Sequence, residues 1–124
     1  MSTTQLLGRF GEAFCAEHLR KKGYRILAMN YRTRLGEIDL IAENRRYIVF
    51  VEVKLRRSDA FAQAREFVTR QKRQRILAAA QTWLALHPSA KQPRFDVAEV
   101  YAPQGAETPA PELRYLENAF GADE

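Results

Sequence analysis

The chain has 124 residues, of which 46% are hydrophobic, and its 20 Lys and Arg residues outnumber its 15 Asp and Glu residues, for a net charge of +5. This length suits a single domain over residues 1–124, with a frayed tail from about residue 121. Lone Cys15 excludes an intramolecular disulfide, and we expect it to be a small buried hydrophobe. The sequence has no zinc-type Cys/His spacing and no apolar run of membrane-spanning length. We therefore expect a cytoplasmic protein with no membrane partner, whose excess positive charge indicates a polyanionic partner.

Hydrophobic periodicity and turn-forming residues predict an alternation of helices and strands. The first helix carries an apolar stripe that starts with Leu6 and Phe10, and Gly23 caps its end. The elements expected in chain order are a helix over 5–22, a strand over 24–31, hairpin strands over 36–41 and 49–54, a loop with a helical turn over 55–67, a helix over 68–86, a strand over 95–101, a loop over 103–111 and a short edge strand over 113–116. This order indicates an α/β fold with helices packed on a mixed sheet.

The two hairpin strands carry charges where buried strands are normally apolar. Asp39 lies in the first strand, and Glu52 and Lys54 share one face of the second, because side chains alternate along a strand. Either segment alone is explained by a solvated sheet face with an ordinary ion pair. Together they bring two acids and one lysine to one face. Because neighbouring acids repel and lose hydration in an apolar strand, the combination favours a cation between Asp39 and Glu52.

Basic residues are clustered near these acids in the sequence. Such runs are often only solvated faces, but a basic border around acidic residues is suited to attracting phosphate. The candidate nucleic-acid-binding residues are Arg32, Arg34, Arg56, Arg57, Lys72, Arg73 and Arg75. For Lys72, a phosphate contact and plain solvent exposure are alternatives to a place in the site itself.

Several short motifs, in this order, resemble the PD-(D/E)xK nuclease superfamily. More closely, the chain resembles the YraN family, also called UPF0102, of small bacterial proteins related to Holliday-junction resolvases. The motifs are Gly11-Glu12, Gly36-Glu37-Ile38-Asp39-Leu40, Val51-Glu52-Val53-Lys54, Arg94-Phe95-Asp96-Val97 and Glu117-Asn118-Ala119-Phe120. Two positions depart from the usual pattern: Ile38 replaces a proline before Asp39, and Phe61-Ala62 stands where relatives have Phe-Gly.

The resemblance implies a restriction-endonuclease-like core of αβββαβ order and a role for each site residue. Asp39, Glu52, the Val53 backbone carbonyl and Glu12 would bind Mg²⁺ or Mn²⁺, since magnesium takes few protein ligands and keeps several waters. Lys54 would lie beside the attacking water or the phosphate. Asp39, Glu52, Lys54 and Glu12 are thus the candidate catalytic residues, and the alternative for Glu12 is an ordinary helix-surface glutamate.

The expected function is that of a metal-dependent endonuclease acting on structured or branched nucleic acid, DNA rather than RNA. The alternative is a non-catalytic nucleic-acid-binding or protein-recruiting module on the same fold. The helices show no spare apolar patch, so we expect a monomer or a weak homodimer. Asp96, one strand further on, is expected to make a structural hydrogen bond or salt bridge.

Overall fold

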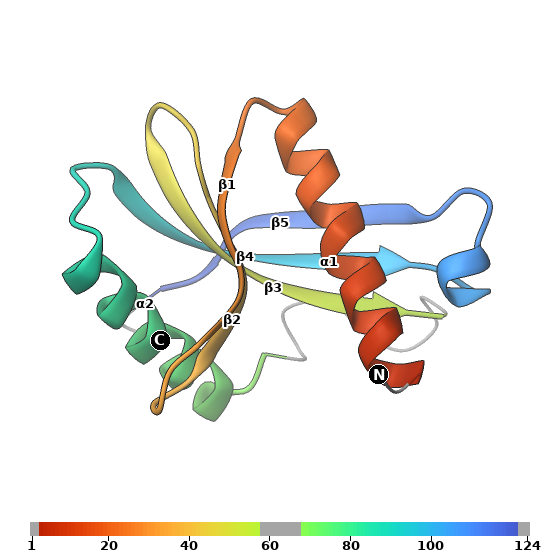
Figure 1. Cartoon of the computed structure of the whole chain (residues 1–124), viewed down its shortest axis with the longest axis horizontal. Helices are drawn as coiled ribbons and strands as arrows, with labels where there is room; N and C mark the ends of the chain where they lie inside the picture. The colour runs from red at the N-terminus through yellow and green to blue at the C-terminus, as the bar shows by residue number, and fades with distance from the viewer. Residues whose placement is uncertain (1–2, 58–67, 122–124) are drawn as a thin grey trace.

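The computed structural model describes residues 3–57 and 68–121 (Figure 1). Its elements in chain order are helix α1 (Thr3–Lys21), strands β1 (Arg25–Arg32), β2 (Glu37–Glu43) and β3 (Tyr47–Arg56), helix α2 (Arg70–Leu86), strand β4 (Gln92–Tyr101), the short 3₁₀ helix η2 (Gly105–Glu107) and strand β5 (Glu112–Phe120). The predicted order is confirmed. Strand β3 continues through Leu55 and Arg56, which the sequence pattern assigns to a loop, and β5 is longer than predicted. Residues 58–67 of that loop, which include Phe61-Ala62, and residues 122–124 lie outside the described residues.

The five strands form one mixed sheet in the order β1-β2-β3-β4-β5. Strands β3 and β4 are parallel, and the other neighbouring pairs are antiparallel. A parallel pair needs a long crossover connection, which α2 supplies. The α/β class and the mixed sheet flanked by helices are therefore confirmed.

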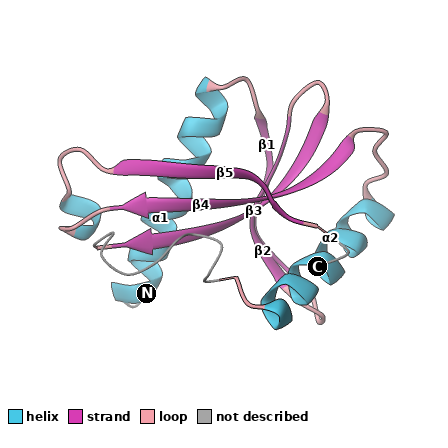
Figure 2. Cartoon of the chain, turned by 180° about the vertical axis from the view of Figure 1, so that it is seen from behind, coloured by secondary structure: helices cyan, strands magenta, loops and turns pink. Residues whose placement is uncertain are grey.

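The helices cover opposite faces of the sheet, and each builds its own core (Figures 1 and 2). Cys15, Ala16 and Leu19 of α1 pack with one set of sheet residues, whereas Ile76 and Trp83 of α2 pack with another. Within the part of the chain that the structure describes, neither helix is long and apolar enough to cross a membrane.

The buried face of α1 differs from the predicted stripe. Leu6 is 56% exposed, whereas Glu12, Cys15 and Leu19 are buried. These three positions are spaced by three and four residues and so share one helix face. The stripe predicted through Leu6 is wrong, but burial of Cys15 is confirmed, and that burial raises the pKa of its thiol to about 12. One result is that a carboxylate, that of Glu12, belongs to the buried face.

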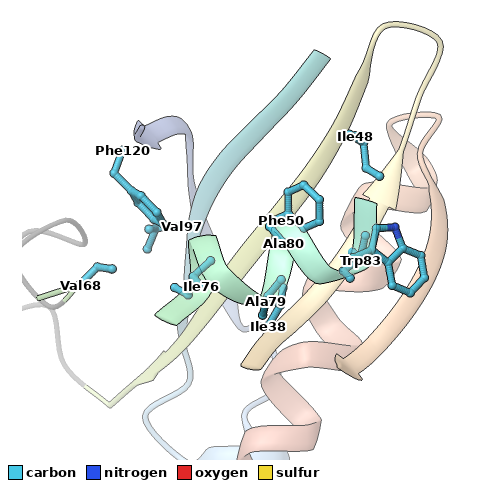
Figure 3. Close-up of a cluster of buried hydrophobic side chains, with 11 residues drawn as sticks. Ile38, Ile48, Phe50, Val68, Ile76, Ala79, Ala80, Trp83, Val97 and Phe120 are labelled. Atoms are coloured by element: carbon cyan, nitrogen blue, oxygen red, sulfur yellow. The ribbon is translucent and has the colours of Figure 1, made fainter. Parts of the chain in front are cut away.

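Helix α2 begins at a side-chain cap and packs on the other face of the sheet. The Thr69 hydroxyl accepts a hydrogen bond from the Lys72 N–H at 3.1 Å, which satisfies an otherwise unpaired donor of the first turn. Figure 3 shows the packing of this helix, in which Ile76 and Trp83 join the same buried cluster as Phe50 of β3. The cap and this packing fix where the first turn, with Lys72, meets the sheet.

Asp96 is the centre of a buried polar network in β4. Arg94 donates to both carboxylate oxygens of Asp96, with Nε at 3.0 and 3.2 Å and Nη2 at 2.9 Å. The hydroxyl of Tyr115 and the backbone N–H of Asn118 also donate to this carboxylate, at 2.6 and 2.8 Å. The predicted structural role of Asp96 is confirmed. The network joins β4 to β5, and it extends to the Tyr24 hydroxyl, which accepts from Arg94 at 2.8 Å.

Gly36, at the start of the Gly36–Leu40 motif, is where the turn before β2 touches α2. A Cβ atom added there would overlap the backbone carbonyl of Arg75. We expect Gly36→Ala to lower the free energy of unfolding by about 1–3 kcal/mol, the usual effect of overpacking. Gly8→Ala is the matched control, because a Cβ at Gly8 meets nothing within 4 Å and a helix-interior alanine should stabilise by about 0.5–1 kcal/mol. Urea unfolding measures both; equal stability of the two variants would contradict the close contact.

Candidate active site

The candidate site lies where β2 separates from β3. The two strands pair from Glu43↔Ile48 to Leu40↔Val51, and Figure 1 shows them diverging beyond that point. One further step of the same register would set Asp39 opposite Glu52. Instead of a backbone pair, the Asp39 carboxylate accepts the Val53 N–H at 2.8 Å. The predicted antiparallel hairpin is confirmed.

The side chains of β2 do not alternate strictly through this point. Ile38 and Ile41 belong to the same core cluster, on the α2 side of the sheet. In a regular strand, two residues three positions apart would lie on opposite faces. Ile38 and Leu40 would share one face of a regular strand, but Leu40 packs on the α1 side and Ile38 on the α2 side. Asp39 stands at this change of face, so residues from both helices can approach it.

The environment of Asp39 makes its ionised form costly. Burial is the main cause, and the nearby Glu52 carboxylate adds to it; together they raise the pKa of Asp39 to about 7. The hydrogen bond from Val53 opposes the shift, Glu12 adds to it and Lys72 again opposes it. A carboxyl group with a pKa near neutrality, next to a second acid, gains more from a bound cation than an ordinary surface aspartate does.

Glu52 is buried and pairs with two lysines. The Lys54 ammonium lies 3.3 Å from a carboxylate oxygen of Glu52, and the Lys72 ammonium contacts the same oxygen. Burial lowers the pKa of Lys54, and its contact with Lys72 lowers it further. Burial is also the largest single influence on Lys72 and would lower its pKa, but the hydrogen bonds to Glu52 and Lys54 and the charges of the nearby acids together raise it. Lys54 is therefore the lysine that releases its proton more readily.

Glu12 reaches the same region from α1. Its carboxylate accepts a hydrogen bond from the Asn30 side chain at 2.9 Å. Burial raises the pKa of Glu12, and the charge of Glu52 adds to the rise against the effects of Asn30 and Arg9. Glu12 is thus not a solvent-exposed helix glutamate.

A cation would meet two carboxylates and one backbone carbonyl here. Among the described residues, no three Asp, Glu, His or Cys side chains are grouped closely enough to hold a metal ion, so Glu12 does not form such a group with Asp39 and Glu52. In a strand the N–H and C=O of one residue point to the same side, so the Val53 carbonyl faces the side that β2 has left. Two carboxylates, a carbonyl and water fit the preference of Mg²⁺.

The candidate nucleic-acid-binding residues fall into two groups. Lys72, Arg56 and Arg73 have partners inside the protein: Glu52 for Lys72, the buried Glu99 at 3.5 Å for Arg56, and the Val68 carbonyl at 3.0 Å for Arg73. The others are exposed, and Arg32 makes a surface ion pair with Glu37 at 3.4 Å. The exposed group is Arg32, Arg34, Arg57 and Arg75.

The family model described as "Uncharacterised protein family UPF0102" matches residues 11–100, which include Glu12, Asp39, Glu52, Lys54 and Lys72 of the candidate site. The chain belongs to this family. A UPF0102 protein of Alkaliphilus metalliredigens is 44% identical over 115 residues, covering 92% of this chain and 96% of the relative. One from Stutzerimonas stutzeri is 41% identical and covers 97% and 98%. One from Caldanaerobacter subterraneus is 47% identical and covers 77% and 79%.

Sequence reasoning missed Asn30 as a site residue. Asn30 has a positive φ of 54°, a conformation that asparagine tolerates better than most residues. Its side chain binds Glu12 from near the end of β1. The signal available in the sequence was an asparagine near the end of a largely apolar strand, where it has low strand propensity.

Proposed function

We propose that this UPF0102 protein is a metal-dependent endonuclease with a restriction-endonuclease-like core, and that Asp39 and Glu52 hold its Mg²⁺ or Mn²⁺. The observation that carries the proposal is the placement of these two acids side by side at the point where β2 leaves β3. The Glu52 charge contributes to the raised pKa of Asp39. A fold gains no stability from such a pair, whereas a divalent cation is bound by it.

The neighbouring groups supply what hydrolysis of a phosphodiester needs. When bound, the metal would lower the pKa of a coordinated water and neutralise phosphate charge. Lys54 is half-buried beside Glu52, within reach of the attacking water or a phosphate oxygen. Lys72 contacts the same oxygen of Glu52 as Lys54 does. Glu12, held by Asn30, provides a further carboxylate nearby that can accept hydrogen bonds from water.

The substrate we propose is structured or branched DNA. Four arginines are exposed and can contact phosphate groups: Arg32, Arg34, Arg57 and Arg75. The described residues of one chain contain one such pair of neighbouring acids, Asp39 and Glu52, so a monomer would cut one strand at a time. A weak homodimer on a branched substrate would place two sites on two strands.

A cleavage assay tests the proposal. Duplex, flap, single-strand and four-way DNA substrates are incubated with Mg²⁺, with Mn²⁺ or with EDTA, and the products are mapped on each strand. We expect nicks near junctions or flaps in either metal and none in EDTA. Cleavage that persists in EDTA, or no cleavage of any of these substrates in either metal, would overturn the proposal.

The two lysines on Glu52 favour a second candidate, a module that binds nucleic acid without cutting it. Their charges already balance the Glu52 carboxylate, so the cluster can be satisfied without a metal. In that case binding would be unchanged by EDTA and would weaken steeply with salt. A protein-recruiting module would instead bind DNA weakly, with little dependence on salt.

A further inference from the structure

A pocket lies away from the candidate active site, at the carboxyl ends of β3 and β4. It has a volume of about 610 Å³ and is bounded by Arg57, Tyr101, Arg114, Gln104 and Glu112, with Pro103 and Pro109 among its apolar walls. This volume is within the usual range of about 300–1,000 Å³ for small-molecule sites. None of the acids of the candidate active site lines it. The combination of arginines, an aromatic ring and prolines restricts the ligand that it suits.

A flat stacking surface forms part of this pocket. The guanidinium carbon of Arg114 lies 5.3 Å from the centre of the Tyr101 ring, within the range of a cation–π contact. A guanidinium plane and an aromatic ring are the two protein surfaces on which unpaired nucleobases stack. Arg114 is still 47% exposed in its side chain, so its guanidinium remains accessible to a ligand.

Buried Glu99 holds this surface in place. It is 0% exposed, it accepts the Tyr101 hydroxyl at 3.1 Å, and Arg114 lies 3.9 Å from the same carboxylate. Arg56 pairs with its other oxygen at 3.5 Å. A buried carboxylate is costly unless several donors satisfy it, so this arrangement fixes both the ring and the guanidinium rather than leaving them as loose surface side chains.

The loop that forms the rim is also held. The backbone N–H of Gln104 donates to the Thr108 hydroxyl at 2.9 Å. Gly105 is buried with a φ of +61°, and a Cβ there would lie 2.7 Å from Leu7 of α1. The loop therefore packs tightly on α1, which sets Gln104 beside the stacking surface, where its amide can hydrogen-bond the edge of a base.

We infer that this pocket binds a nucleotide, with its base stacked on the Arg114–Tyr101 surface and its phosphate bound by Arg57. Arg57 is exposed at the mouth of the pocket and supplies the cation that a phosphate requires. Strand β3 joins this pocket to the active site: Arg56, the partner of Tyr101 in the sheet, is four residues, or about 13 Å, beyond Glu52. One strand of nucleic acid can therefore reach both places.

This inference deepens the proposed function. It rests on that function only for one claim, that the strand bound in the pocket is also the strand that is cut. The nucleotide can be free or part of a strand, and both forms present the same base and phosphate. Oligothymidylate and thymidine 5′-monophosphate separate the two, and thymidylate strands have no internal pairing that would compete with stacking.

Calorimetric titration in EDTA, with these two probes, tests the pocket. Arg114→Lys keeps the charge and the contact with Glu99 but removes the plane, so it should weaken oligothymidylate binding by about 5- to 150-fold, the equivalent of one lost base stack. Arg57→Gln, at an exposed position, should weaken binding and flatten its salt dependence by about 0.7 in log–log slope. Arg45→Lys, in the turn at the far end of β3, is the matched control and should bind as the parent does.

If these variants bind both probes more weakly than the parent does, the pocket is a mononucleotide site. If only oligothymidylate binding is weakened, the pocket is a subsite for a strand. Either result supports a nucleotide pocket. Failure of the parent to bind either probe, or binding that neither Arg114→Lys nor Arg57→Gln weakens, would overturn the inference. The active-site proposal is judged separately by metal-dependent cleavage. Probe binding lost in Arg114→Lys in a protein that never cleaves would leave the pocket standing and the nuclease proposal overturned.

Discussion

Lys54→Met should lower the rate of metal-dependent cleavage by about 10²- to 10³-fold, the range seen when one charge-stabilising donor is removed from an active site. Lys54 is the half-buried lysine whose pKa is lowered by burial, and its ammonium lies 3.3 Å from Glu52. Methionine keeps much of the length and apolar surface of lysine, so packing is retained. Lys72 still pairs with Glu52 in this variant, which keeps the buried carboxylate compensated.

Single-turnover cleavage of a flap substrate measures the rate, and gel-shift titration in EDTA measures binding. Binding should change little, because the phosphate contacts that we propose come mostly from exposed arginines. Lys22→Met is the matched control, since Lys22 is exposed at the end of α1. Equal loss of binding and cleavage in Lys54→Met would make Lys54 a phosphate-binding residue, and unchanged cleavage would remove it from the site.

Local patterns were sufficient to predict most of the fold. Alternating apolar residues and the turn at 43–46 predict the β2–β3 hairpin, and the Asn44 side chain there accepts hydrogen bonds from the Arg46 and Tyr47 N–H groups. Helix α2 was predicted within two residues at its start, because its cap and apolar spacing are local signals. The parallel pairing of β3 with β4 depends on a crossover between distant segments, so only the order of the elements indicates it.

The site was predictable in its residue types and less so in its geometry. Asp39, Glu52 and Lys54 are visible as charges in apolar strands. The separation of β2 from β3 is not visible, because it arises where a side chain replaces a backbone partner. The burial of Glu12 was also hidden, since the apolar residues Leu6 and Phe10 suggest another face of α1. Gly11, next to Glu12, faces Val53 and Leu55 of β3, where an added Cβ would make ordinary van der Waals contacts.

Asp39→Asn should abolish metal binding and at the same time stabilise the metal-free protein at high pH. Asparagine is nearly the same shape, and its side-chain oxygen can still accept the Val53 N–H, but it carries no charge to repel Glu52. Removing a functionally required repulsion commonly raises stability by about 0.5–2 kcal/mol. Mn²⁺ at about 100 times its dissociation constant should add about 2.7 kcal/mol to the parent and nothing to the variant.

The effect of Asp39→Asn on the free energy of unfolding depends on pH. The pKa of Asp39 rises from an ordinary value of 3.8 to about 7 in the folded protein, so between these pH values the folded state keeps a proton that the unfolded state has lost. The contribution of Asp39 to the free energy of unfolding therefore falls as the pH rises from about 4 to 7, and stays low above that. The gain from Asp39→Asn should be absent near pH 4 and complete by pH 8.

Urea unfolding in EDTA at pH 4 to 8 measures the gain, and calorimetric titration with Mn²⁺ at pH 8 measures metal binding. Glu37→Gln is the matched control, because Glu37 lies on the same strand, is exposed and pairs only with Arg32 among the ion pairs of the described residues. It should change neither quantity by more than a surface substitution does. If Asp39→Asn lowers stability at pH 8, the carboxylate serves the fold through its bond to Val53; if it binds Mn²⁺ as the parent does, the cation is held elsewhere.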